Sequence, residues 1–200
     1  MPSTMSGSRD KDTLFDLLYS KAFRQSLLPE FKLTSGQTSH FFLDCKKVSL
    51  DPHGAFLIGE AIFERIKLLP VDGVGGMTLG ADPIATAVAV ISYIKQKPIS
   101  GFIVRKERKQ HGSGQQVEGS LSREAKLVVV EDVVTTGGST LRTINVLRSE
   151  GYTILKVVAL IDRLQGGADK IVAAGVPFEA LYTMNDFTHA STLQQPVNFS

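Results

Sequence analysis

Short, almost wholly apolar runs recur along this 200-residue chain, each flanked by polar or glycine-rich residues. Such runs, rich in Val and Ile, are typical of strands that are buried on both faces of a sheet. Longer stretches with apolar residues at helical spacing lie between them. Alternating strands and helices predict an α/β fold with a central, mainly parallel β-sheet flanked by helices. The strands are expected at about residues 71–76, 99–104, 126–132, 154–162 and 177–184.

Two of the predicted helices carry start signals. Asp51-Pro52 and Asp82-Pro83 each place a capping acid before a proline, so helices are expected to begin there and to run to about residues 69 and 95. Before the first of them, the chain is expected to form a small N-terminal unit of one amphipathic helix and short strands around a turn at 34–37. The other helices are expected at 12–28, 141–150 and 168–174, and the short strands at 31–33 and 40–44.

The most informative chemistry follows the strand predicted at 126–132. This strand ends in Glu131 and Asp132, and a turn of small, hydroxyl-bearing residues comes next. Two acids at a strand end can bind vicinal ribose hydroxyls, while the backbone N–H groups of a glycine-bearing turn and of the next helix start can bind a phosphate. The segment therefore predicts a sugar-phosphate site rather than an ordinary capped corner. Its residues are Glu131, Asp132, Val133, Val134, Thr135, Thr136, Gly137, Gly138, Ser139 and Thr140.

A second segment, residues 105–119, is cationic and rich in glycine. Arg105, Lys106, Lys109 and His111 gather there with little apolar surface. One interpretation is a solvated run of charge; the other is a mobile loop that closes over a polyanion and excludes water. Beside a predicted phosphate site, the loop is favoured. Neither a P-loop nor a dinucleotide fingerprint with its downstream acid occurs in the chain.

The residues around Glu131-Asp132 resemble the 5-phosphoribosyl-1-pyrophosphate (PRPP) motif of type I phosphoribosyltransferases. The cationic segment is similar to the catalytic loop of the orotate phosphoribosyltransferases within that group. Three further stretches agree with the same family in matching order, and the likeness extends from about Phe31 to Arg163. They are Leu33 to Phe42, Val74 to Ala85 and Ile161-Asp162-Arg163.

The resemblance implies one phosphoribosyltransferase domain over residues 1–200, with a small N-terminal hood at about 1–45 and a mobile catalytic loop at about 105–119. It implies transfer of phosphoribosyl from PRPP to orotate, with Mg²⁺ bound through PRPP near Glu131 and Asp132. It also implies a homodimer whose active sites are shared. Lys109, His111 and Asp132 are the expected catalytic residues. The expected PRPP ligands are Arg105, Lys106, Lys109, His111 and residues 131–139, and the expected orotate ligands are Phe41, Phe42, Thr135 and Arg163.

Three positions depart from the commoner family pattern. Thr34 and Leu79 stand where many members carry lysine, so any share they take in the site is steric or through the backbone. Glu131 replaces the commoner aspartate and keeps the charge with a longer reach. On an alternating strand, only one of Phe41 and Phe42 is expected to approach a base, while the other faces the core.

Composition limits the remaining function classes. A formal net charge of +2 gives no reason to expect nucleic-acid or membrane binding. The single cysteine, Cys45, cannot form an intramolecular disulfide, which favours a cytoplasmic location. The histidines form no zinc-like cluster along the sequence. Two alternatives stay open: a phosphoribosyltransferase for another base, and a non-catalytic PRPP-sensing regulator.

Overall fold

The computed structural model describes residues 13–26, 28, 31–32, 38–107 and 115–193. Within these residues, the centre is a six-stranded sheet in the order β10-β9-β8-β5-β6-β7, parallel except for β7, which pairs antiparallel with β6. The predicted mainly parallel α/β sheet is therefore confirmed. Its strands are β5 (Gly73–Met77), β6 (Ser100–Val104), β7 (Val117–Glu118), β8 (Lys126–Val134), β9 (Thr153–Asp162) and β10 (Phe178–Thr183).

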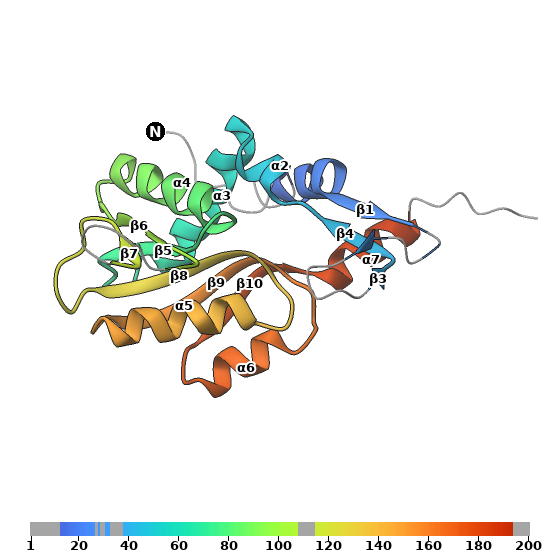
Figure 1. The fold of residues 1–200 in the computed structure, drawn as a ribbon. Helices are drawn as coiled ribbons and strands as arrows, with labels where there is room; N and C mark the ends of the chain where they lie inside the picture. Colours follow the sequence, from blue (N-terminus) through green and yellow to red (C-terminus); the bar gives the residue numbers. More distant parts are fainter. Residues whose placement is uncertain (1–12, 27, 29–30, 33–37, 108–114, 194–200) are drawn as a thin grey trace, which may run out of the picture.

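Helices cover both faces of this sheet (Figure 1). One face carries α3 (Pro52–Ile66) and α4 (Ala81–Ile94), and the other carries α5 (Gly138–Ser149) and α6 (Gly167–Ala173). The strand alternation divides the buried residues accordingly: Val128 and Val130 belong to one core cluster, and Leu127 and Val129 to the other. Since side chains alternate along β8, Glu131 and Asp132 must leave the strand toward opposite faces.

A smaller unit, here named the hood, is formed by the described residues between 13 and 45. It holds η1 (Leu18–Ala22), the antiparallel pair β1 (Phe23–Gln25) with β4 (Phe41–Leu43), and the antiparallel pair β2 (Phe31–Lys32) with β3 (Thr38–Ser39). Figure 1 places the hood at one end of the sheet, beside the C-terminal helix α7 (Met184–Leu193). A short helix, α2 (Lys46–Ser49), connects the hood to α3.

Aromatic rings join the hood to the C-terminal helix. Phe187 of α7 is fully buried, and its ring centroid lies 5.0 Å from that of Phe15 and 5.4 Å from that of Phe23. Tyr182 of β10 contributes an edge-on contact to the same ring. Offset and edge-on packing of this kind stabilises aromatic clusters beyond simple burial. The hood is therefore anchored to the sheet by residues from both ends of the chain.

The first helix is shorter than the apolar spacing predicts. Its helical turns end at Ala22, and Phe23 takes an extended conformation with φ −83° and ψ 139°. Residues 23–25 then pair with residues 41–43 of β4, which also removes the Phe23 side chain from water. Strand pairing and burial outweigh the local helix preference here, and the predicted extension to residue 28 is wrong.

The two predicted helix starts behave differently. Asp51 caps α3 as expected, since its Oδ1 accepts from the backbone N–H groups of His53 (3.1 Å) and Gly54 (3.0 Å). Asp82 does not cap α4, which already begins at Ala81. Instead, its carboxylate accepts a hydrogen bond of 2.8 Å from Thr78 Oγ1 in the preceding loop. That loop lies at the carboxyl end of β5, so Asp82 holds a segment of the predicted site rather than a helix end.

Candidate active site

Part of the predicted site lies at the carboxyl ends of β8 and β9. These strands are parallel neighbours, and their register places Val134 opposite Asp162. The backbone N–H of Arg163 continues the pairing with a 2.8 Å hydrogen bond to the carbonyl of Val134. Residues 131–139 and Arg163, far apart in sequence, therefore lie at one edge of the sheet. This edge is where ligands of open parallel sheets bind.

Glu131 points toward α5 and is 6% exposed. Its Oε2 accepts hydrogen bonds from Ser139 Oγ (3.0 Å) and Thr140 Oγ1 (3.1 Å) at the start of that helix. Burial, followed by the nearby charge of Asp132, raises the pKa of Glu131 from 4.5 to about 7. The hydroxyls of Ser139 and Thr140 thus donate to Glu131, and these two hydrogen bonds connect the end of β8 to the start of α5.

Asp132 is half-buried and leaves β8 on the opposite face. Its Oδ1 accepts a 2.8 Å hydrogen bond from the backbone N–H of Val133. The backbone of Gly80, in the loop after β5, lies directly against this carboxylate: a Cβ at that position would be 2.6 Å from both Cγ and Oδ1 of Asp132. Asp132 is therefore the more accessible acid of the pair, and its position depends on the close approach of a glycine.

In the turn between β8 and α5, Gly137 takes a positive φ and Gly138 is already the first residue of the helix. Gly137 precedes the helix at φ 78°, a conformation that L side chains rarely adopt. The carbonyl of Thr135 accepts a 3.0 Å hydrogen bond from the backbone N–H of Gly167, which ties the turn to α6. Thr136, Gly138 and Ser139 are exposed. Because the first amides of a helix have no acceptor within it, the start of α5 offers an anion site.

The side chains of Val133 and Val134 do not line this turn. Val133 is half-buried and packs against the core cluster under α3 and α4. Val134 is 1% exposed and belongs to the cluster on the α5 face. Any contact of these two residues with a ligand would therefore be made by their backbone.

The other end of the site, after β9, is built around Arg163, which is only 8% exposed. Its Nη2 donates to Ser39 Oγ at 3.1 Å and to the carbonyl of Phe41 at 3.4 Å, so the guanidinium bridges β9 and the hood. Its Nε is buried and has no hydrogen-bond partner in the described part of the chain. Burial lowers the pKa of Arg163. Among the described residues no carboxylate forms an ion pair with this cation, although Asp162 precedes it in the chain.

The two phenylalanines of β4 separate as the strand alternation predicts. Phe41 packs against the core cluster and stacks on Phe23, with ring centroids 5.9 Å apart. Phe42 is 37% exposed and stacks on Phe31 at 5.7 Å. Phe42 therefore has the freer ring, while Phe41 reaches Arg163 through its backbone carbonyl.

Only part of the cationic segment lies within the described residues. Arg105 and Lys106 follow β6 and are exposed, and Arg105 Nη1 lies 3.2 Å from Glu118 Oε1 of β7. Lys109 and His111 lie outside the described residues, as does Thr34. Leu79 follows Thr78 through a cis peptide bond, and its side chain is 62% exposed.

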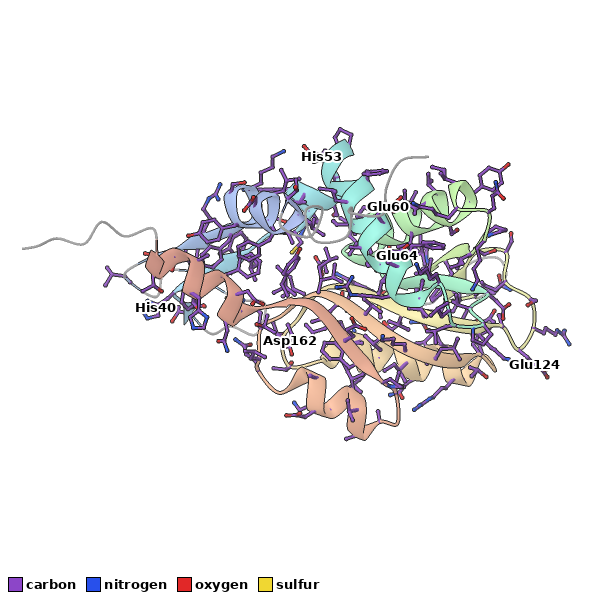
Figure 2. The ribbon with its side chains drawn as sticks, turned by 180° about the vertical axis from the view of Figure 1, so that it is seen from behind. His40, His53, Glu60, Glu64, Glu124 and Asp162 are labelled. Carbon is purple, nitrogen blue, oxygen red and sulfur yellow. The ribbon has the colours of Figure 1, made fainter. Side chains whose placement is uncertain are left out.

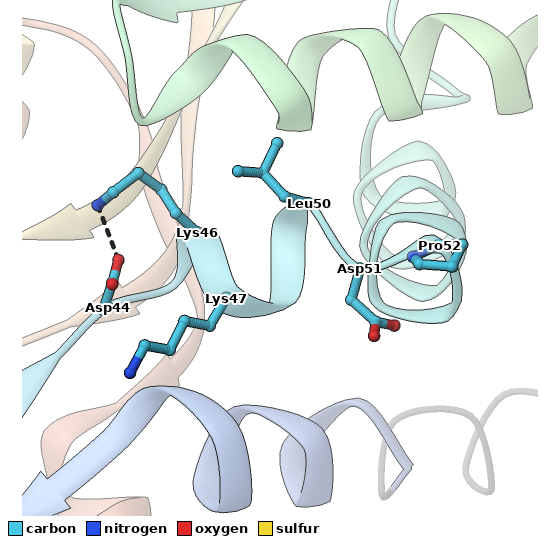
Figure 3. A pocket seen from close by; sticks show the side chains of 6 residues that line it. All are labelled: Asp44, Lys46, Lys47, Leu50, Asp51 and Pro52. Carbon is cyan, nitrogen blue, oxygen red and sulfur yellow. Dashed lines mark ion pairs between the residues drawn. The ribbon is translucent and has the colours of Figure 1, made fainter.

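Sequence reasoning missed a cation at the same edge. Lys46 of α2 pairs with Asp44 at 2.8 Å, and Figure 3 shows its side chain pointing away from that of Lys47. The pKa of Lys46 is raised first by its hydrogen bond with Asp44 and further by the charges of Asp44 and Asp132. The run Lys46-Lys47 after a predicted strand was the available signal, but it does not reveal which lysine turns toward the sheet.

A metal centre made by the protein alone is not found in the described part of the chain, where no three His, Cys, Asp or Glu side chains are grouped to hold an ion. Figure 2 shows His40 in the hood and His53 at the start of α3, well separated from each other, with Asp162 at the strand end between the sheet and the hood. The carboxyl ends of the two strands therefore carry two carboxylates on β8 and a buried cation after β9.

Comparisons with known proteins find relatives that match over most of the chain. A family model described as a phosphoribosyl transferase domain matches residues 75–186. The orotate phosphoribosyltransferase of Aquifex aeolicus (strain VF5) is 40% identical over 177 residues, which are 88% of this chain and 97% of that protein. That of Nostoc sp. (strain PCC 7120 / SAG 25.82 / UTEX 2576) is 44% identical over 188 residues, covering 92% and 88%.

Solved structures give the same result. The orotate phosphoribosyltransferase of Mycobacterium tuberculosis H37Rv in complex with Fe(III) dicitrate has a TM-score of 0.78 and 31% identity, covering 89% of this chain and 98% of that one. The same protein in complex with PRPP has a TM-score of 0.74 and 30% identity, covering 90% and 99%. The likeness thus extends over about nine-tenths of the chain.

Proposed function

The chain belongs to the orotate phosphoribosyltransferase family, and on that basis we propose how its residues divide the two substrates between them. The activity is that of a pentosyltransferase in pyrimidine synthesis: a nitrogen of orotate displaces pyrophosphate from C1 of PRPP and gives orotidine 5′-monophosphate. The alternatives of another base or a non-catalytic sensor are not favoured. The assignment of individual residues below is our proposal.

Asp132 binds the ribose hydroxyls of PRPP. It is the half-buried acid, and Gly80 and the amide of Val133 hold its carboxylate in place. Glu131 lies beneath the turn, where it orders the start of α5 through Ser139 and Thr140. The 5′-phosphate is bound by the backbone amides of residues 135–139 and by the exposed hydroxyl of Thr136, at the positive end of the α5 dipole.

The departing pyrophosphate requires positive charge. By analogy with glycosyl transfer, the sugar becomes cationic in the transition state while the leaving group gains negative charge. Arg105 and Lys106 are exposed at the end of β6, where they can reach an anion at this edge. Lys109 and His111 complete the proposed set. These groups stabilise the leaving group electrostatically, and the reaction needs no covalent nucleophile.

The carboxylates fit a Mg²⁺ ion that is bound mainly by the substrate. Carboxylate oxygens suit this cation, but Glu131 is buried and its Oε2 already accepts two hydrogen bonds. Asp132 alone of the pair is open enough to approach a metal, so PRPP oxygens would supply most of the ligands. When bound, the ion would neutralise charge on the pyrophosphate. Asp132 would position the ribose and the metal ion relative to each other.

The buried cation Arg163 carries the assignment of orotate as the base. A buried guanidinium without a carboxylate partner is unfavourable, and the unpartnered Nε adds to that cost. A carboxylate on the base would supply the missing opposite charge, and arginine is well suited to binding that group. Thr135, half-buried beside it, and the ring of Phe42 would border the rest of the base.

Turnover with different bases tests this assignment. Purified protein with PRPP and Mg²⁺ should consume orotate and should leave uracil, hypoxanthine and adenine unchanged. The consumption of orotate is measured by the loss of its absorbance. Folding of the sample is checked by circular dichroism. If a folded sample turns over a base without a carboxylate as efficiently as it turns over orotate, the proposed role of Arg163 is contradicted.

We further propose a homodimer whose partner covers an apolar groove between α3 and α4. The groove has a volume of about 630 Å³ and is lined by exposed apolar side chains, among them Leu50, Phe56 and Val90. Leu79, from the loop beside Asp132, lies at the same groove. A partner seated there would therefore adjoin the substrate site, which supports shared active sites and makes a second copy the favoured occupant.

Two measurements test the dimer. Val90→Glu should give monomers in analytical ultracentrifugation, whereas Val172→Glu, which alters an equally exposed valine on α6, should leave dimers. Mixing Lys109→Ala with Asp132→Ala subunits should restore part of the activity, because one intact site can then form from two chains. Verified heterodimers without any activity would contradict shared sites.

Cytoplasmic location is also a proposal. The one cysteine, Cys45, is a buried free thiol, as suits a reducing compartment. The helices in the described ranges are all too short or too polar to cross a membrane.

A further inference from the structure

We infer that Ser39 is a positioning residue for Arg163, and that through this cation it sets the preference for a base that carries a carboxylate. The inference deepens the proposed function and rests on it. Ser39 belongs to β3 of the hood, whereas Arg163 follows β9 in the central sheet. The hydrogen bond between them spans 124 positions of sequence.

The contacts define how the guanidinium is held. Nη2 of Arg163 donates to Ser39 Oγ at 3.1 Å and to the carbonyl of Phe41 at 3.4 Å. Ser39 Oγ also accepts a 3.1 Å hydrogen bond from the backbone N–H of Phe41. A hydroxyl oxygen has two acceptor positions, and both are used here. Ser39 therefore fixes the guanidinium and the local backbone of the hood at the same point.

This arrangement commits Nη2 of the guanidinium to the hood and leaves Nε without a hydrogen-bond partner among the described residues. Both hydrogens of Nη2 are directed to the hood, whereas Nε is buried and unpartnered. Since the guanidinium is planar, fixing Nη2 also fixes the direction in which Nε points. The side chain of Arg163 is thereby ordered before the ligand arrives.

Without Ser39 Oγ, only the longer contact to Phe41 would hold Nη2. A long cationic side chain has considerable rotamer freedom, and ordering it on binding weakens affinity. Loss of the hydroxyl should therefore reduce affinity for a carboxylate-bearing ligand and leave other ligands of the same pocket unaffected. A role confined to folding would weaken all ligands alike.

Two product-like nucleotides separate these possibilities. Orotidine 5′-monophosphate carries the base carboxylate, and uridine 5′-monophosphate is the same molecule without it. In calorimetric titration, Ser39→Ala should lower the affinity for orotidine 5′-monophosphate by about tenfold. The affinity for uridine 5′-monophosphate should fall by less than twofold. Ser39→Thr retains the hydroxyl and should restore affinity. Ser26→Ala, which removes another hood serine hydroxyl, is the matched control and should change neither.

The outcomes are distinguishable. If Ser39→Ala weakens both nucleotides equally, or leaves the wild-type preference intact, the inference is wrong while the proposed function stands. If the wild-type protein binds both nucleotides equally, the role of Arg163 in the proposed function is wrong, and the inference falls with it. If only the alanine variant loses the preference and threonine rescues it, Ser39 is the positioning residue.

Discussion

The two ends of the site are built in different ways, although the strands that carry them are neighbours. At the ribose end, Glu131 binds Ser139 and Thr140, residues only eight and nine positions later in the chain. At the base end, Arg163 binds Ser39 and Phe41, more than 120 positions earlier. The first end is local and internally satisfied. The second is assembled from distant segments and retains a buried, unpartnered donor.

This difference separates two kinds of recognition. Binding of a sugar phosphate relies on backbone amides and carboxylates, which one strand–turn–helix unit can supply. In the proposed assignment, choice of the base relies on one buried cation, whose orientation depends on how the hood packs on the sheet. Changes at the base end should therefore alter which base is used, and changes at the ribose end should alter how well PRPP is used.

Replacement of the buried cation should have the largest effect. Arg163→Leu keeps an apolar stem but removes every guanidinium donor, so kcat/KM for orotate should fall by at least about a hundredfold. The affinity for PRPP, measured by equilibrium binding, should stay within about twofold. If the affinity of Arg163→Leu for PRPP falls as much as its kcat/KM for orotate, the two ends of the site do not act separately.

A smaller effect is expected from a single methyl group at the ribose end. In Gly80→Ala, the new Cβ would meet the Asp132 carboxylate at 2.6 Å, so the acid must shift. We expect kcat/KM for PRPP to fall by about tenfold or more, because small displacements of a positioned group are costly. Steady-state kinetics would measure it.

Gly101→Ala is the matched control, since a Cβ there would find no atom nearer than 3.9 Å. It should leave the kinetics unchanged. If Gly80→Ala behaves in the same way, Asp132 is not held by this contact.

The smallest effect concerns the pH dependence of stability. The folded protein raises the pKa of Glu131 from 4.5 to about 7, so it binds that proton more tightly than the unfolded chain does. Ionisation of Glu131 therefore lowers stability as pH rises across this interval, and the penalty is complete above it. Glu131→Gln carries no such charge.

Thermal melts should therefore show that the melting temperature of Glu131→Gln, relative to that of the wild type, rises by about 2–4 °C between pH 5 and pH 8. Glu150→Gln, which neutralises an exposed acid at the end of α5, should show no relative gain. A wild-type melting temperature that rises across this interval relative to Glu131→Gln would mean that the turn stabilises the carboxylate form.

Sequence determined the features that depend on neighbours along the chain. The apolar runs predicted the sheet strands within a few residues, since a strand buried on both faces admits few polar side chains. The acid pair, the hydroxyl-rich turn and Gly137 predicted the strand–turn–helix unit of β8 and α5, because each acts within that one unit. Asp51 as a helix cap belongs to the same class.

Tertiary structure decided what depends on segments brought together by folding. Pairing of β1 with β4 ended the first helix at Ala22, and the loop contact of Thr78 took Asp82 away from its predicted cap. The turn of Lys46 toward the sheet and the bridge from Arg163 to Ser39 likewise arise only when the hood packs against the strand ends. The burial of Glu131 depends on the packing of α5 against β8. Periodicity and spacing record what a residue can do locally, whereas burial and long-range hydrogen bonds decide what it contacts.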